Sequence, residues 1–102
     1  MKALLVCQAG MSTAILCKKL AKEAQKKAAN LDIEAVGLES AGKVSLGKDL
    51  VLLAPQIKYA AQAIRQEVPA EIPIMILSSQ DFGLMNAETI YRKMNQVVEA
   101  KR

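Results

Sequence analysis

Cys7 stands at the end of an apolar stretch and just before a segment that is typical of a strand-to-helix turn. That segment consists of Gln8, Ala9, Gly10, Met11, Ser12 and Thr13. Gly10 permits a tight turn and a close approach of a ligand to the backbone. The first N–H groups of the helix that follows have no partners inside the helix, and together with the helix dipole they favour a bound anion. The hydroxyl groups of Ser12 and Thr13 add donors, so the segment predicts a phosphate-binding loop with a thiol at its mouth.

The chemistry that such a thiol could perform is phosphoryl transfer. An anion site favours the thiolate form of Cys7, and a thiolate is a nucleophile that needs no neighbouring base. This suits a chain with no histidine, the commonest general base. The loop amides would hold the equatorial oxygens of a phosphoryl group during in-line transfer to the sulfur. The sequence therefore indicates a catalytic Cys7, although a cysteine at a strand end is also often only a small buried apolar residue.

The other cysteine, Cys17, is expected to have a packing role. It lies one turn before Leu20 and Ala21 in the apolar band of a predicted helix. Two cysteines do not make a disulfide framework, and free thiols are expected in a reducing cytosol. A redox pair of Cys7 and Cys17 stays open as an alternative. With two cysteines and no histidine in the chain, we expect no zinc site, and neither a metal nor another cofactor is expected.

Apolar patterns predict strands that alternate with helices. The strands are predicted at residues 3–7, 31–39, 49–54 and 72–77. The helices are predicted at residues 11–29, at 55–68, and after Asn86, whose side chain suits an N-cap. The first helix has an apolar stripe formed by Leu16, Leu20, Ala24 and Ala28. Residues 40–48, with one helical turn at 41–46, and residues 78–85 are predicted to be loops.

This alternation predicts a single-domain α/β sandwich of three layers, with helices on both faces of a four-stranded parallel sheet. The order 2-1-3-4 places the two most apolar strands, the first and the third, in the centre, and the strand order reverses between them. In open α/β sheets the ligand site lies at the carboxyl ends of the strands beside this reversal. Those ends are Cys7 and the turn at Ala54, Pro55 and Gln56. Topology and loop composition thus indicate the same site.

Length and composition indicate one compact cytoplasmic domain over residues 1–102. Hydrophobic residues make up 52% of the chain, enough for a core. The apolar runs are shorter than the roughly 20 residues of a membrane span, and no signal peptide is visible. The net charge is +4 but aromatic residues are only 3%, so nucleic-acid binding is not expected. Docking to an acidic protein surface is compatible with this charge, and a monomer is the expected state.

Two segments resemble a known family. Residues 7–13, which follow an apolar strand, resemble the phosphocysteine loop of IIB components of bacterial sugar phosphotransferase systems, in the lactose/cellobiose group. The segment Val51–Ile57, which reads Val-Leu-Leu-Ala-Pro-Gln-Ile, resembles the second signature of that group. The resemblance covers nearly the whole chain in length and element order. It implies the same four-stranded parallel fold, which is similar to low-molecular-weight tyrosine phosphatase and flavodoxin-like folds.

The resemblance also implies a function, that of a phosphoryl carrier and phosphotransferase in sugar transport. Cys7 matches the phosphorylated cysteine, residues 8–13 match the loop around the phosphoryl group, and Pro55 and Gln56 match the turn that faces this loop. The family implies a IIA partner whose phosphohistidine is the donor. It also implies a IIC membrane permease that holds the acceptor, a sugar such as cellobiose, chitobiose or lactose.

One segment departs from the family pattern. After the fourth strand the family often shows Tyr-Gly followed by an Asp-Gly pair. Here the chain reads Phe82-Gly83-Leu84-Met85-Asn86-Ala87. Details of partner docking at this segment are therefore not carried over.

Two other functions compete with the carrier. A low-molecular-weight phosphatase or arsenate reductase also has a cysteine between its first strand and first helix, but it needs an arginine six residues later to clamp phosphate. Thr13 occupies that position, and Asp81 is the one aspartate placed to serve as general acid. The other competitor is a regulatory homologue without catalysis. A receiver domain is excluded, because Cys7-Gln8 and Ala54-Pro55 stand where its acidic residues would be.

Overall fold

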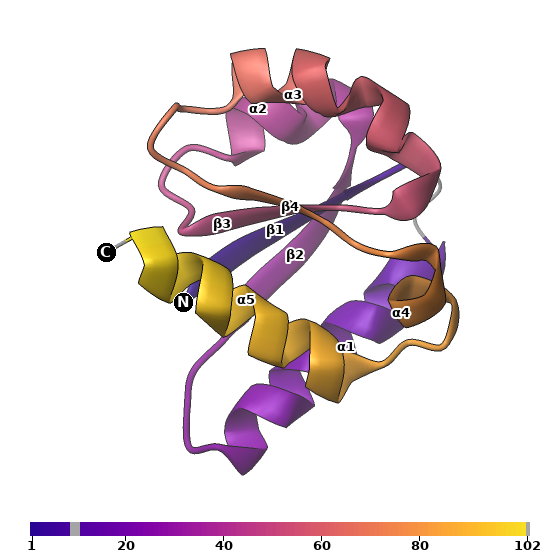
Figure 1. Cartoon of the computed structure of the whole chain (residues 1–102), viewed down its shortest axis with the longest axis vertical. Helices are drawn as coiled ribbons and strands as arrows, with labels where there is room; N and C mark the ends of the chain where they lie inside the picture. The colour runs from indigo at the N-terminus through magenta and orange to yellow at the C-terminus, as the bar shows by residue number, and fades with distance from the viewer. Residues whose placement is uncertain (9–10, 102) are drawn as a thin grey trace.

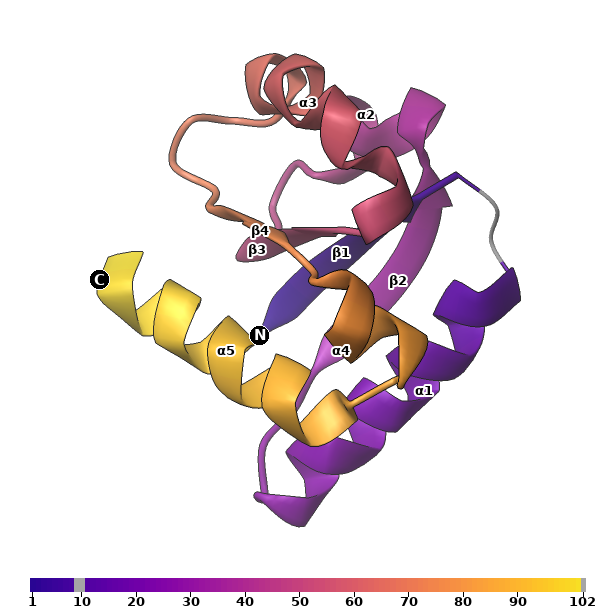
Figure 2. The ribbon, with the colours of Figure 1, turned by 45° about the vertical axis from the view of Figure 1, so that its right-hand side comes forward.

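A central sheet separates two layers of helices in the computed structural model, which describes residues 1–8 and 11–101 (Figure 1). The helices are α1 (Met11–Lys26), α2 (Ala41–Val44), α3 (Ala61–Glu67), α4 (Ser79–Gly83) and α5 (Ala87–Lys101), with short 3-10 helices η1 (Leu38–Ser40) and η2 (Pro55–Ala60). Helices α2 and α3 cover one face of the sheet, and α1 and α5 lie side by side on the other (Figures 1 and 2). The predicted fold class is confirmed.

The sheet has four parallel strands in the order β2-β1-β3-β4. The strands are β1 (Lys2–Cys7), β2 (Asp32–Gly37), β3 (Leu50–Leu53) and β4 (Ile74–Ile76). The central strands β1 and β3 are almost fully buried, as their continuous apolar runs predicted. In the β1–β2 register Val6 lies beside Val36 and Cys7 beside Gly37. The predicted strand order is therefore confirmed. Cys7, the last residue of β1, lies at the carboxyl edge of the sheet.

Helix α1 follows its predicted apolar stripe but ends earlier than predicted. The buried part of the stripe consists of Leu16, Leu20 and Ala24. After Lys26 the chain turns, and Ala28 takes a left-handed conformation with φ of 55°. The N–H of Ala28 donates to the carbonyl of Gln25 (3.0 Å) and that of Ala29 to the carbonyl of Ala24 (2.9 Å). This pair of bonds is a Schellman C-cap, so Ala28 is exposed and does not extend the stripe.

The predicted helix at 55–68 is divided into two parts. It starts as η2 and continues as α3, with a non-helical residue, Ile57, near its start (φ −116°, ψ 19°). Ile57 and Ile64 are buried, so the predicted apolar face is present despite the kink. At the C-terminal end of α3 the guanidinium of Arg65 donates to the carbonyls of Val68 (3.4 Å) and Pro69 (2.6 Å). The helix thus ends just before Pro69, as the proline at this position predicts.

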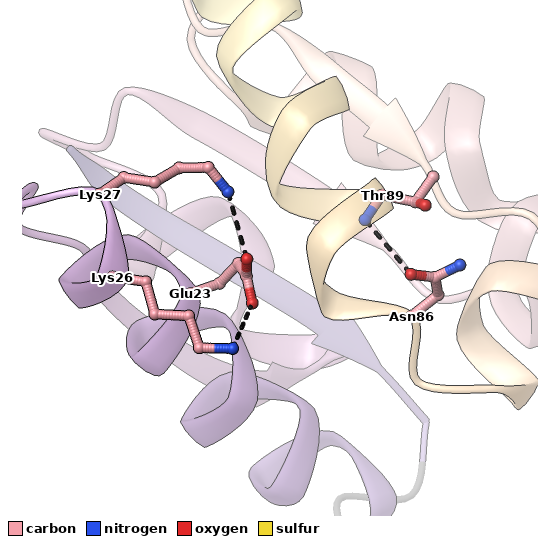
Figure 3. A network of polar contacts seen from close by, with 5 residues as sticks. All are labelled: Glu23, Lys26, Lys27, Asn86 and Thr89. Atoms are coloured by element: carbon pink, nitrogen blue, oxygen red, sulfur yellow. Dashed lines mark hydrogen bonds and ion pairs between the residues drawn. The ribbon is translucent and has the colours of Figure 1, made fainter.

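The segment predicted as a loop at 78–85 contains the short helix α4, which is a correction. The hydroxyl of Ser78 accepts from the backbone N–H of Asp81 (3.0 Å), and Phe82 is buried. This is an N-cap hydrogen bond of the usual kind. The second N-cap was predicted correctly, because the side-chain oxygen of Asn86 accepts from the N–H of Thr89 at the start of α5 (3.3 Å; Figure 3).

A charged cluster joins the C-terminal half of α1 to α5. The carboxylate of Glu23 pairs with the ammonium groups of Lys27 (3.1 Å) and Lys26 (3.6 Å; Figure 3). Lys27 also lies over the ring of Tyr91 on α5, 5.6 Å from its centroid. The hydrogen bond from Lys27, together with both nearby lysine charges, lowers the pKa of Glu23 against a smaller opposing effect of burial. The cluster therefore requires an ionised Glu23.

We expect the contribution of Glu23 to stability to depend on pH. Because its folded-state pKa is lowered, the contribution is present above the unfolded-state value of about 4.3 and is lost as pH falls through the folded value. Thermal unfolding of the wild type and of Glu23→Gln should differ by a few degrees near pH 7 and by less near pH 3. Glu99→Gln, an exposed change on α5, is the control and should show no such trend. Equal Tm differences at both pH values would contradict the expectation.

Candidate active site

Cys7 is the last residue of β1 and its side chain is directed toward α1. The residue is only 4% exposed. Its sulfur lies 3.3 Å from the hydroxyl oxygen of Thr13, the third residue of α1, and either atom can be the donor. When the sulfur is a thiolate, the Thr13 hydroxyl must donate, and such a bond stabilises the negative charge. The sequence placed these two residues in one loop, and the structure brings their polar atoms into contact.

The other residues of the predicted phosphate-binding loop are described to different extents. Gln8 follows β1 and is exposed. Ala9 and Gly10 lie outside the described residues. Met11 and Ser12 form the start of α1, so their backbone N–H groups belong to the first helical turn, where such groups have no intrahelical partner. The end of β1 and the start of a helix of 16 residues thus meet at the sulfur.

Pro55 and Gln56 lie at the same edge of the sheet as Cys7. They begin η2, which follows β3 after the single residue Ala54. The N–H of Ala54 donates to the carbonyl of Val6 (3.0 Å), which holds the end of β3 beside the end of β1. Gln56 is exposed, and neither residue is among the described residues that line the cavity next to Cys7. The turn is therefore near the site without forming its wall.

A cavity of about 550 Å³ opens beside Cys7 between α1 and the edge strand β2. It is lined by Cys7, Gln8, Ala14, Cys17, Ile33, Glu34, Ala35, Val36, Gly37 and Glu39. Sequence reasoning identified Cys7 and Gln8 but missed the contribution of β2 and η1. That contribution depends on which residue of β2 pairs with Cys7 in the sheet. The apolar pattern of a strand does not specify which residues of the neighbouring strand pair with it. No lysine or arginine is among the described residues of the lining.

Cys17 lines the same cavity, and both cysteines are free thiols. Its partly buried side chain packs against the core, as predicted. Burial, and to a lesser extent the charge of Cys7, raise the pKa of Cys17 to about 11. Cys17 is therefore a neutral thiol at pH 7 and a poor nucleophile.

Alkylation should distinguish the two cysteines. Near pH 8, iodoacetamide should label Cys17 more slowly than Cys7, because only the thiolate reacts and the raised pKa of Cys17 keeps that thiol protonated. Labelling of Cys17 should become fast only as the pH approaches its pKa of about 11. Peptide mass spectrometry of protein quenched at short times gives both rates from one sample. Equal rates near pH 8, or faster labelling of Cys17, would contradict the expectation.

Asp81, the candidate general acid of the phosphatase alternative, forms an ion pair with Lys93. Its carboxylate accepts a hydrogen bond from the ammonium group of Lys93 on α5 (2.8 Å). This bond, with the Lys93 charge and the Ser78 hydroxyl, lowers the pKa of Asp81. The side chain is thus ionised at neutral pH and carries no proton to donate. Asp81 is also not among the described residues lining the cavity of Cys7, so the phosphatase alternative has neither its arginine nor its acid.

The described residues offer neither a metal site nor a membrane-spanning helix. Within 1–8 and 11–101, no cluster of His, Cys, Asp or Glu is suited to hold a metal ion. None of the helices in that part of the chain is both long enough and apolar enough to cross a membrane.

Comparison with known proteins gives one consistent family. Residues 2–93 match the model of the lactose/cellobiose-specific IIB subunit of the phosphotransferase system. An oligo-beta-mannoside-specific EIIB component of Bacillus subtilis is 28% identical over 90% of each chain. A galactose-specific EIIB component of Lactococcus lactis is 29% identical, over 84% of this chain and 85% of the relative.

Solved structures agree with this family. A cellobiose-specific IIB component of Borrelia burgdorferi has a TM-score of 0.81 and 36% identity, covering 99% of this chain and 94% of its own. A lactose-specific IIB domain of Streptococcus pneumoniae shares the fold, with a TM-score of 0.82 at 16% identity over 95% and 96% of the two chains. The chain belongs to the lactose/cellobiose-specific IIB subunits of sugar phosphotransferase systems, and it is a phosphotransferase.

Proposed function

We propose that Cys7 accepts a phosphoryl group from the phosphohistidine of a IIA partner and passes it to a sugar bound by a IIC permease. The observation that carries this proposal is the position of the thiol, at the carboxyl end of a central strand, 3.3 Å from the Thr13 hydroxyl and beside a cavity. IIB subunits work together with IIA and IIC components, so a carrier must meet two partners in turn. A phosphoryl group bound to a side chain at the edge of the sheet can be exchanged with each of these partners.

Each transfer is an in-line displacement at phosphorus. In the first, the Cys7 thiolate forms an S–P bond while the N–P bond of the donor breaks, and the electron pair of that bond stays on the imidazole nitrogen. In the second, a sugar hydroxyl oxygen forms an O–P bond while the S–P bond breaks, and the sulfur becomes a thiolate again. The hydroxyl proton leaves to solvent or to a base of the permease. Cys7 is thus regenerated in the form that started the cycle.

The remaining site residues have supporting roles in the proposal. The backbone of Gln8, Ala9, Gly10, Met11, Ser12 and Thr13, with the hydroxyls of this segment, holds the oxygens of the phosphoryl group. Pro55 and Gln56 flank the site from the end of β3. No metal or other cofactor takes part. The domain spans residues 1–102 and works as a cytoplasmic monomer between its partners.

The same geometry favours a carrier over a hydrolase. A phosphatase clamps phosphate with an arginine fork and protonates the leaving group. Here Thr13 replaces that arginine, and Asp81 is paired with Lys93. A site without these groups holds the phosphoryl group less tightly and does not assist attack by water. We propose a β-linked disaccharide of the cellobiose, chitobiose or lactose kind as the sugar, in keeping with relatives that include a cellobiose-specific EIIB component of Lactococcus lactis.

The proposal is tested by locating the phosphoryl group. The protein is incubated with a phosphorylated IIA component of the lactose/cellobiose type and measured by intact mass spectrometry. We expect the mass of a single phosphoryl group, found on the peptide that contains Cys7. Alkylating Cys7 beforehand should prevent labelling. Labelling that persists after alkylation, or that maps to a serine, threonine or Cys17, would refute the assignment.

A further inference from the structure

The carboxylate of Glu39 occupies the space beside Gly37 in which any other residue would have a side chain. A Cβ atom at position 37 would lie 2.6 Å from Oε1, 2.9 Å from Oε2 and 3.0 Å from Cδ of Glu39. Real Cβ atoms do not come this close to their neighbours. Gly37 has an ordinary extended conformation (φ −79°, ψ 170°), so a side chain at this position would be opposed by the Glu39 carboxylate and not by backbone geometry.

This position brings the carboxylate next to Cys7. Gly37 is the register partner of Cys7 in the parallel β1–β2 pair. Register partners on neighbouring strands direct their side chains to the same face of the sheet, and the strands are about 4.8 Å apart. The Glu39 carboxylate therefore lies on the face to which the Cys7 side chain points, one strand away. Both residues line the same cavity.

No neighbour within residues 1–8 and 11–101 neutralises the charge of Glu39. The other carboxylate of the cavity lining, that of Glu34, pairs with the ammonium group of Lys48 (3.2 Å). Among the described residues, Glu39 makes no ion pair and no hydrogen bond, and it is exposed. The described wall of the cavity thus carries one unbalanced negative charge, at Glu39.

We propose that Glu39 tunes the transfer reaction through its charge. The carboxylate repels anions at Cys7, and it thereby lowers the affinity of the site for a phosphoryl group. In the proposed function the loop amides and the Thr13 hydroxyl attract the phosphoryl oxygens, and Glu39 would oppose them. A phosphocysteine beside a carboxylate is higher in free energy and is passed on more readily. The part of this inference that concerns phosphocysteine rests on the proposed function, whereas the repulsion of anions does not.

The repulsion is measured with two alkylating reagents of nearly the same size. Iodoacetate is an anion and iodoacetamide is neutral, so the ratio of their rates at Cys7 reports local charge and cancels changes in access or in thiol reactivity. In Glu39→Gln the iodoacetate/iodoacetamide ratio should rise by about 3- to 10-fold, as Coulomb's law gives for one charge a few ångströms away in a partly aqueous site. The increase should shrink in high salt, which screens exposed charges.

A second variant tests the geometry without removing the charge from the chain. In Gly37→Ala the new methyl group must displace the Glu39 carboxylate, which is the mobile end of a flexible side chain. The ratio should therefore rise as it does in Glu39→Gln, while the Tm stays close to that of the wild type.

Glu71→Gln is the matched control. Glu71 is exposed and precedes β4, at the opposite end of the sheet, and its removal changes the net charge equally but should leave the ratio unchanged.

The outcomes separate this inference from the proposed function. If the ratio is the same in the wild type, Glu39→Gln and Gly37→Ala, or if Glu71→Gln raises it equally, the inference is overturned. If the ratio behaves as expected, equilibration with phosphorylated IIA should favour phosphocysteine in Glu39→Gln by about 10-fold over the wild type, since the phosphoryl group carries more charge than the reagent. Labelled Cys7 with an unchanged equilibrium constant would overturn the phosphocysteine part alone. No labelling of Cys7 in any variant would instead overturn the proposed function.

Discussion

Replacing Cys7 by serine is expected to lower phosphoryl acceptance by at least about a thousandfold, the scale seen when an enzyme loses its nucleophile. A serine hydroxyl stays protonated at neutral pH and needs a neighbouring base to attack phosphorus. The chain has no histidine to supply one. The serine is close in size to cysteine, and the hydroxyl of Thr13 is in place to pair with it, so the fold should be retained. The measurement is the rate at which phosphorylated IIA loses its phosphoryl group to each variant.

The matched control is the second thiol. Cys17→Ala changes the lining of the same cavity but removes no nucleophile, because Cys17 is a neutral thiol at pH 7. Its acceptance rate should stay within about 3-fold of the wild type, which corresponds to less than about 1 kcal/mol. A Cys7→Ser variant that still accepts at the wild-type rate would show that another residue carries the phosphoryl group. An inactive Cys17→Ala would indicate that both thiols are required.

Replacing Thr13 by valine is expected to slow phosphoryl acceptance by about 10-fold. Valine keeps the shape of the side chain, which is only 1% exposed, but it removes the hydroxyl that lies 3.3 Å from the Cys7 sulfur. A hydrogen bond to a charged group contributes about 1.5–3 kcal/mol net. Loss of this hydrogen bond leaves the Cys7 thiolate less well stabilised. The substitution also removes a donor to the oxygens of the incoming phosphoryl group. Acceptance rates and iodoacetamide alkylation of Cys7 should both fall at pH 7.

Thr13→Ser provides the control for this prediction. It restores the hydroxyl and removes a methyl group, so it should recover most of the rate even though the packing of α1 is loosened. If valine and serine slow the reaction equally, the role of Thr13 is packing and not hydrogen bonding. If neither change alters the rate, the contact seen between Oγ1 and Sγ has no part in transfer.

The arrangement of the sheet was predictable because it depends on features that a single sequence displays. Buried parallel strands are continuous apolar runs, and the runs at β1 and β3 are the most apolar in the chain. Right-handed crossovers then leave few strand orders. Once these strands are central, their carboxyl ends form one edge, which is why the sequence alone predicts that Cys7 and the turn at Pro55 lie near each other.

Element boundaries were less predictable because side chains and local hydrogen bonds decide them. The alanines predict a first helix that continues to residue 29, whereas the backbone turns at Ala28 with a left-handed φ that alanine seldom adopts. The apolar pattern does not predict helix α4, although Ser78 with Asp81 three residues later is a capping signal at the start of a helix. The kink at Ile57 has no signal in the sequence that we can name.

The composition of the cavity was the least predictable part of the site. Cys7 and Thr13 were found from the loop itself, since they are six residues apart at one strand-to-helix turn. Glu39 is distant in sequence and reaches the site only because Gly37 lies beside Cys7 in the sheet. A shift of that register by one residue would turn the Gly37 position to the other face of the sheet. Such pairings between strands are set by the packing of the whole domain.

The carrier role is tested most directly by following one phosphoryl group through the protein. Protein labelled on Cys7 with radioactive phosphate is separated from its donor and added to membranes that contain the IIC permease and its sugar. We predict that the label leaves Cys7 and appears in stoichiometric amount as sugar phosphate, and that it stays on Cys7 when the sugar is omitted. Label that appears as inorganic phosphate, with or without sugar, would contradict the account and indicate a hydrolase.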